Sequence, residues 1–190
     1  MTTTFNVAIV FASGYGHTKA VAEAVAEGAN GVEGVTATLY HLPDVDWDAL
    51  DQADAIIFGS PTYMGNVSAP FAQFKDDSSK RWFSQAWKDK VAAGFTVSAS
   101  WSGDKNITMT TLQILALQHG MVWVGLDLMP GNNSSAGSPD DLNNVGATSG
   151  LFVQANADQG NEGIRESSFA TARHFGQRVA LSTQRWGKEG

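Results

Sequence analysis

Short apolar runs recur along the chain and predict strands that are buried on both faces. The first run, Phe5 to Phe11, is rich in β-branched and aromatic residues and ends before Ser13-Gly14. Runs without polar alternation are typical of parallel strands that are covered on both sides. Further runs of this kind are Val35 to Tyr40, Ala55 to Phe58, Val91 to Ser98, Met121 to Val124 and Leu151 to Val153.

Between these runs, apolar residues recur at the spacing of amphipathic helices. In the first such segment Val21 and Val25 share a face, and Glu23 and Glu27 lie on the opposite one. The alternation of strands and helices predicts an α/β protein, with a parallel sheet covered by helices on both sides. The helical segments are Thr18 to Ala29, Pro70 to Lys80, Asn106 to His119 and Arg165 to Ser182.

Two segments show neither pattern. Pro130 to Asp141 is rich in Gly, Asn, Ser and Pro, and a structureless insertion of this length is usually functional, intersubunit or mobile. The tail from Thr183 to Gly190 is expected to fray. No linker divides the sequence, so we expect a single domain over residues 1–190.

The composition narrows the class of protein. The absence of cysteine excludes disulfides, thiolate metal sites and cysteine nucleophiles. With 12 basic and 19 acidic residues the formal net charge is −7, and no basic run is present, which argues against nucleic acid as a partner. The run from Phe5 to Phe11 is far shorter than the ~20 residues of a membrane span, so we expect a cytoplasmic protein without membrane insertion.

The segment after the first strand is a candidate phosphate site. Its residues, Ser13-Gly14-Tyr15-Gly16-His17-Thr18, join the strand to the first helix. The two glycines permit a tight turn, and hydroxyl groups, an imidazole and free backbone N–H groups converge at a helix N-terminus, where anions bind. An ordinary glycine-containing turn is the alternative interpretation.

Two better-known phosphate motifs do not fit this segment. A Walker A loop needs Gly-Lys-Ser/Thr, which is absent. The dinucleotide fingerprint needs a third glycine, where the chain has Lys19, and an acidic residue after the second strand, which here ends in Tyr40-His41.

A second candidate segment follows the third strand. Within Pro61-Thr62-Tyr63-Met64-Gly65-Asn66 the proline fixes a bend, and the Tyr-Met pair offers flat, polarisable surface. The backbone of Gly65-Asn66 can approach a planar ligand. The alternative is a turn whose Tyr and Met side chains cover the edge of the sheet.

A third segment, Ser98-Ala99-Ser100-Trp101-Ser102-Gly103, follows the fourth strand. Its small residues allow a ligand close to the backbone, while Trp101 can either stack on that ligand or pack against the protein. Ligands of doubly wound sheets bind beyond the carboxyl ends of the strands. All three segments belong to that end, and together they favour a phosphate joined to a flat heterocycle.

In this order the three segments resemble those of the WrbA-like NAD(P)H:quinone oxidoreductases, which are flavodoxin-fold proteins that bind FMN. The likeness extends from Val7 to about Val124, and it is strongest in Ser13 to Thr18, Gly59 to Asn66 and His119-Gly120-Met121. The resemblance implies a flavodoxin-like, doubly wound, five-stranded parallel sheet of order 2-1-3-4-5 in a three-layer αβα sandwich.

The resemblance also implies roles for individual residues. Ser13 to Thr18 would hold the FMN phosphate, Pro61 to Asn66 would line the isoalloxazine and ribityl chain, and Ser98 to Gly103 would contact the polar edge of the ring. Trp82 and His119 would border the pocket in which nicotinamide and quinone stack on the flavin. Alternatively, His119 ends a helix whose dipole favours a cation there, and Trp82 packs in a core or interface.

The chain departs from the family pattern at several points. His41 to Ala53 lacks the longer insertion that contributes to assembly in the family, Tyr63 replaces a common Arg, and the third segment continues into Asp104-Lys105 where the family is richer in glycine. Ring access and the choice between NADH and NADPH are therefore open. A homo-oligomer, dimer or tetramer, is expected from the six Trp residues and the Pro130 to Asp141 insertion.

The remaining polar residues indicate no other chemistry. The sequence contains no His-x-x-x-His pair and no Gly-x-Ser-x-Gly elbow, which argues against a metal site and against serine hydrolysis. We expect solvated positions for His174 and for the acidic residues Asp44, Asp46, Asp48 and Asp51.

The leading hypothesis is an FMN-dependent enzyme that transfers hydride from NADH or NADPH to a quinone. The main alternative is a flavodoxin-like carrier of single electrons, with Tyr63 and Trp101 flanking the ring; a cofactor-free interaction protein is the third. Because the phosphate segment contains no Arg and its nearest Lys is Lys19, we expect hydroxyls, amides and the helix N-terminus to bind the phosphate.

Overall fold

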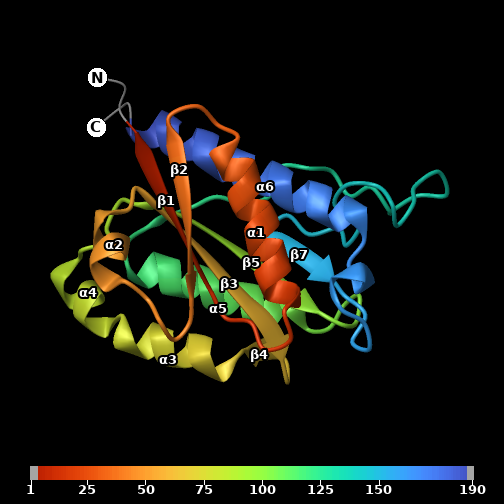
Figure 1. Ribbon diagram of the computed structural model, residues 1–190, viewed down its shortest axis with the longest axis horizontal. Helices are drawn as coiled ribbons and strands as arrows, with labels where there is room; N and C mark the ends of the chain where they lie inside the picture. The colour runs from red at the N-terminus through yellow and green to blue at the C-terminus, as the bar shows by residue number, and fades with distance from the viewer. Residues whose placement is uncertain (1–3, 188–190) are drawn as a thin grey trace.

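A parallel sheet with helices on both faces forms the centre of the protein in this computed structural model, which describes residues 4–187 (Figure 1). The strands are β1 (Phe5–Phe11), β2 (Val35–His41), β3 (Ala55–Tyr63), β4 (Asn66–Val67), β5 (Val91–Ser98), β6 (Val122–Trp123) and β7 (Leu151–Gln154). The helices are α1 (His17–Asn30), α2 (Trp47–Gln52), α3 (Ala69–Asp77), α4 (Ser79–Ser84), α5 (Lys105–Gln118) and α6 (Glu166–Gly187), preceded by a 3₁₀ turn at Asn161–Gly163.

The order of the sheet is β2-β1-β3-β5, and both β6 and β7 lie beside β5. β6 pairs with Val91 and Ala92, and β7 pairs with the stretch from Phe95 to Ser98, all in parallel. The predicted flavodoxin-like order is therefore confirmed, with the fifth position divided between two short strands. The small antiparallel strand β4, beside β3, is an addition that the apolar pattern does not predict.

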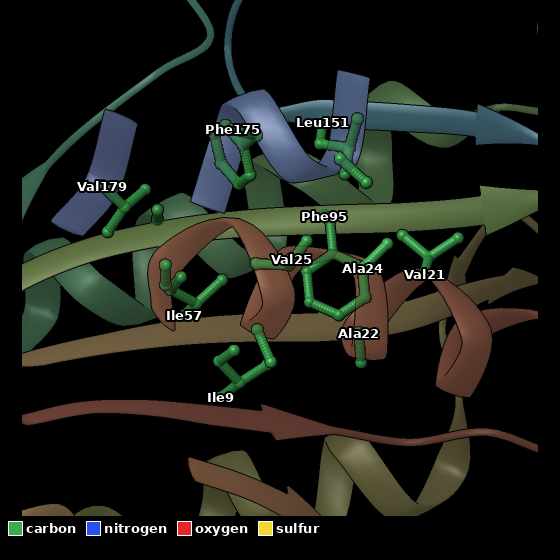
Figure 2. Packing of buried hydrophobic residues seen from close by; sticks show 14 of the residues in the cluster. Ile9, Val21, Ala22, Ala24, Val25, Ile57, Phe95, Leu151, Phe175 and Val179 are labelled. Carbon is green, nitrogen blue, oxygen red and sulfur yellow. The ribbon is translucent and has the colours of Figure 1, made fainter. Parts of the chain in front are cut away.

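Alternate residues of the central strands face two separate cores. Ile9, Ile57 and Phe95 point toward α1 and α6, as Figure 2 shows. Their neighbours Val10 and Phe58 belong to the second core, on the side of α2, α3 and α5. This two-sided burial explains why the strands are apolar runs without polar alternation.

Helices α1 and α6 lie side by side on one face of the sheet and pack backbone against backbone (Figure 1). A Cβ added to Gly28 would lie 1.8 Å from the carbonyl oxygen of Arg173, and one added to Gly176 would lie 1.9 Å from that of Val25. Only glycine fits at either position. The close packing fixes α1, and with it the phosphate segment at its N-terminus.

The structure corrects the predicted fraying from Thr183 and shows the expected irregularity of the insertion. Helix α6 continues through Gly187, because Thr183 is buried and the indole of Trp186 donates a hydrogen bond to the carbonyl of Asp89. The rest of that tail, 188–190, lies outside the described residues. Pro130 to Asp141 forms turns and bends without helix or strand. No helix in the described part of the chain is long and apolar enough to cross a membrane.

Candidate functional site

A cavity of about 450 Å³ lies at the carboxyl ends of β1, β3 and β5. Residues from all three predicted segments line it, together with residues from a fourth segment after β7. The lining residues are Tyr15, His17, Thr18, Pro61, Thr62, Tyr63, Val97, Ser98, Ala99, Ala155 and Ala157.

The first segment presents free backbone donors at the start of α1. Gly16 has a φ of +98°, which ends the turn and lets the helix begin at His17. The hydroxyl of Ser13 accepts a hydrogen bond from the amide of Lys19 (3.2 Å). Within residues 4–187, the N–H groups from Tyr15 to Thr18 have no hydrogen-bond acceptor. Such a set of donors fits a phosphate without a cationic side chain.

Tyr63 connects the second segment to the first. A Cβ on Gly14 would lie 2.8 Å from the Tyr63 hydroxyl, and the rings of Tyr15 and Tyr63 meet edge to face, with centroids 6.2 Å apart. Burial, followed by the nearby Tyr15, raises the pKa of Tyr63, so its hydroxyl stays protonated at neutral pH. The rest of the turn faces outward: Met64 is fully exposed at a φ of +48°.

Three buried threonines form a hydroxyl chain beneath the cavity. The hydroxyl of Thr62 donates to that of Thr108 over 2.8 Å. Because this uses the single hydroxyl proton of Thr62, the hydroxyl of Thr96 is the donor in the second hydrogen bond, to Thr62, also over 2.8 Å. Neither Thr96 nor Thr108 is among the site residues predicted from the sequence. Thr96 carries a detectable signal, because it is a hydroxyl residue within an apolar run, two residues before Ser98, where the predicted third segment begins.

The third segment is divided between two hollows. Ser98 and Ala99 line the cavity described above, whereas Trp101 and Ser102 line a neighbouring hollow of about 520 Å³ together with Lys105. Burial lowers the pKa of Lys105 to about 8, so its ammonium remains mostly charged at neutral pH. Trp101 is therefore beside the cavity wall rather than part of it.

The segment between β7 and α6, which the sequence patterns do not predict as part of the site, closes the cavity on a further side. The Nε2 atom of His17 lies 2.9 Å from the carbonyl oxygen of Gln159 and 3.0 Å from that of Gly160. Because both partners are acceptors, this nitrogen carries the proton. Gln154 donates to the carbonyl of Ala99 (2.8 Å) and joins the same segment to the third one. The available signal was a polar stretch directly after a buried strand.

The structure does not bring His119 and Trp82 to this cavity. α5 runs back along the sheet, so His119 comes just before Val122, which pairs with Val91 at the amino end of β5. Both residues line a different hollow, of about 550 Å³, between α3–α4 and α5. Trp82 is exposed there, whereas His119 is buried.

His119 is held as a neutral imidazole. The hydroxyl of Ser78 donates its single proton to the carbonyl of Lys75, so it can only accept from His119. The ring proton of His119 is therefore on Nε2, which donates to the Ser78 hydroxyl over 3.0 Å. The Nδ1 atom of His119 has no hydrogen-bond partner within residues 4–187. The imidazole packs against Trp87, with ring centroids 4.4 Å apart. Burial lowers the pKa of His119 to about 4, which rules out a cation at this helix end near neutral pH.

Comparisons with known proteins agree with the fold. A family model described as NADPH-dependent FMN reductase matches residues 47–133. Flavodoxin FldP of Pseudomonas aeruginosa is 45% identical, over 90% of this chain and 93% of that protein. An NAD(P)H dehydrogenase (quinone) of Trichlorobacter lovleyi is 34% identical, over 94% of this chain and 97% of that protein.

A solved structure extends this likeness to three dimensions. The flavodoxin, WrbA-like protein from Agrobacterium tumefaciens has a TM-score of 0.76 and 40% identity, and the match covers 96% of this chain and 99% of that chain. A flavodoxin from the domain Archaea shares the fold alone, with a TM-score of 0.68 at 21% identity over 95% of this chain and 99% of that chain. With whole-chain relatives above 30% identity and a cavity at the carboxyl end of a flavodoxin-like sheet, the chain belongs to the WrbA-like, flavodoxin-like family of FMN proteins.

Proposed function

We propose that this protein reduces quinones by two electrons, with FMN as its cofactor and NAD(P)H as the donor. Membership of the family makes it an FMN-dependent NAD(P)H oxidoreductase; the quinone acceptor is the proposed part. Relatives named NAD(P)H dehydrogenase (quinone) support it. The observation that carries the proposal is the cavity itself, in which an anion site and an apolar wall lie together.

The residues of the cavity fit FMN. The free N–H groups from Tyr15 to Thr18, with the hydroxyls of Ser13 and Thr18, would hold the phosphate, and none of the lining residues is Lys or Arg. When bound, FMN supplies the chemistry of accepting and returning a hydride. The protein contributes orientation: Thr62 is fixed by its two hydroxyl partners, and the edge-to-face pair of Tyr15 and Tyr63 lies at one side of the cavity.

Trp82 and His119 take part only if a second copy of the chain brings them to the cavity, because within one chain they line a separate hollow. We therefore propose a homo-oligomer, dimer or tetramer, as the active form. The neutral His119 would then contribute hydrogen bonding rather than charge. A dilute monomer with full quinone reductase activity, seen by sedimentation, would contradict this arrangement.

A carrier of single electrons is the second candidate function. It is favoured by the 45% identical relative named flavodoxin and by the exposed tyrosine pair at the cavity mouth, which could cover a flavin ring. Such a cover would keep hydride donors away. The two candidates therefore differ in how NAD(P)H reacts with the loaded protein.

The decisive experiment is an anaerobic titration of the FMN-loaded protein with NADH and with NADPH. The enzyme hypothesis predicts direct two-electron bleaching of the flavin spectrum, followed by reoxidation with benzoquinone. A stable half-reduced flavin spectrum during dithionite titration, with no reaction toward either nucleotide, would favour the carrier. Protein that takes up no FMN would overturn both.

A further inference from the structure

Lys105, at the first position of α5, is a buried cation in the hollow beside the candidate cavity. Its side chain is only 1% exposed, and within residues 4–187 no carboxylate forms an ion pair with it. A buried ammonium without a counter-charge disfavours folding unless hydrogen bonds compensate for its lost hydration. The position therefore calls for a role beyond packing.

The ammonium of Lys105 binds the main chain of the third segment. It donates to the carbonyl oxygens of Ser100 (2.5 Å) and Trp101 (3.1 Å). The backbone amide of Lys105 donates to the carbonyl oxygen of Ser102 (3.2 Å). The carbonyl of Ala99 accepts from Gln154. Consecutive carbonyls of this segment are thus all occupied by donors from the protein.

The backbone N–H groups of the same segment, unlike its carbonyls, are unpaired. Within the described residues, the N–H groups from Ala99 to Gly103 have no acceptor. A segment with occupied carbonyls, free amides and a buried ammonium is electropositive. It begins at Ser98 and Ala99, which line the FMN cavity, so acceptor atoms of a ligand there would meet these donors.

We propose that Lys105 is a positioning residue of the cofactor site, which binds the carbonyls of Ser100 and Trp101 and so leaves the amides of this segment free for the polar edge of the flavin ring. The inference rests on FMN as the cofactor in the proposed function. Reduction adds negative charge to that edge of the ring, and donors with a nearby cation stabilise such charge. Lys105 would therefore favour the reduced flavin over the oxidised form.

Lys90 provides a matched control within the same chain. Its ammonium also donates to two carbonyls, those of Asp51 (2.9 Å) and Ala53 (2.5 Å), and burial likewise lowers its pKa. It precedes β5 at the amino end of the sheet, whereas Lys105 follows β5 at the carboxyl end. Lys90→Met removes the same charge and the same kind of contact away from the cofactor.

The test measures the dissociation constant of FMN in its oxidised and reduced forms for the wild type, Lys105→Met, Lys105→Arg and Lys90→Met, with circular dichroism to verify folding. Lys105→Met should weaken binding of reduced FMN about tenfold more than binding of oxidised FMN, which lowers the midpoint potential by about 30 mV. Lys105→Arg keeps charge and donors and should stay within about threefold of the wild type. Lys90→Met should leave both constants unchanged.

An unchanged ratio of the two constants in Lys105→Met, or an equal change in Lys90→Met, would overturn the inference and leave the proposed function intact. Wild-type protein that binds no FMN would overturn the proposed function together with it. If Lys105→Met does not fold, Lys105→Gln, which keeps a donor and loses the charge, replaces it. The same tenfold change in the ratio is then expected, and its absence is equally decisive.

Discussion

Polar groups at the amino end of β3 and β5 bind one another, whereas two runs of backbone amides in the loops at the carboxyl end have no acceptor in the described residues. At the amino end, the Asp51 carboxylate accepts from the indole of Trp87 (2.7 Å) and from Arg81 (3.3 Å), and Lys90 donates to the carbonyl of the same residue. At the carboxyl end, the described residues leave the amides of 15–18 and 99–103 without acceptors. Because unpaired donors are costly unless a ligand or water binds them, these free amides support the carboxyl end as the candidate binding site.

The same contrast separates two tryptophans. Trp87 is fully buried and its indole nitrogen is bound to Asp51, whereas Trp101 is exposed beside the candidate cavity. The first stabilises the fold, and the second is available to a ligand. Substitutions at the amino end should therefore change stability, and substitutions at the carboxyl end should change binding.

The largest effect is expected from Trp87→Ala. Loss of a fully buried indole should lower the free energy of unfolding by about 3–5 kcal/mol. The FMN dissociation constant of the molecules that remain folded should not change. Urea unfolding and FMN titration measure the two quantities, and Trp101→Ala is the matched control at the other end. Weakened FMN binding in folded Trp87→Ala would contradict the division between an amino end that stabilises the fold and a carboxyl end that binds the ligand.

The buried His119 should make the protein less stable in acid. Its pKa is about 4 in the folded chain and about 6.5 in the unfolded chain, so only the unfolded chain gains this proton as the pH falls between those values. The free energy of unfolding should decrease by about 3 kcal/mol over that interval.

Comparison of urea unfolding for the wild type and His119→Gln across this pH range isolates the contribution of this residue. The difference in stability between the two proteins should shift in favour of the variant as the pH falls. His41→Gln, at an exposed histidine, controls for the loss of an imidazole elsewhere in the chain. A wild-type curve parallel to that of His119→Gln would disprove the neutral, buried state.

A negative charge at the phosphate segment should separate binding from stability. Ser13→Asp places a carboxylate beside the start of α1, where it repels the FMN phosphate and weakens binding about 100-fold. The same carboxylate interacts favourably with the dipole of α1, which should raise the free energy of unfolding by about 0.5 kcal/mol. Fluorescence titration with FMN and urea unfolding give both values. If the neutral isostere Ser13→Asn weakens binding as much as Ser13→Asp, charge is not the cause.

The smallest effect is expected from Tyr63→Phe. The change removes the hydroxyl that contacts Gly14 and keeps the ring, so it should lower stability by less than ~1 kcal/mol. FMN binding should weaken about two- to threefold, because the first and second segments are less firmly joined. Tyr15→Phe is the control. Equal FMN affinity in both variants would show that the Gly14–Tyr63 contact does not organise the cavity.

The sequence patterns predicted the fold because periodicity reports local burial. The runs around Ile9 and Phe58 are apolar on both faces, which requires helices on both sides of the sheet. The division of the fifth strand was not predictable in this way. It depends on where β6 and β7, separated by a long insertion, align beside β5.

The candidate site was predictable in its loops and not in its more distant members. Strand direction places Ser13, Thr62 and Ser98 at one end of the sheet, and the resemblance to a known family added the cofactor. The fourth segment, with Gln159 and Gly160, is defined only by its contact with His17. The roles of Trp82 and His119 stay predictions, because a second chain would have to complete the cavity.

The divided fifth strand makes the protein a favourable host for inserted sequences. β6 and β7 are each anchored to β5 independently, and the chain between them leaves the sheet and returns. Its exposed tip, near Asn133 and Ser134, lies beyond the base that Asn143 fastens to the carbonyl of Leu128. Doubling the length of such a loop costs only about 0.6 kcal/mol. A fluorescent reporter or affinity module placed there would leave the parallel register undisturbed and provide a flavin-based redox sensor.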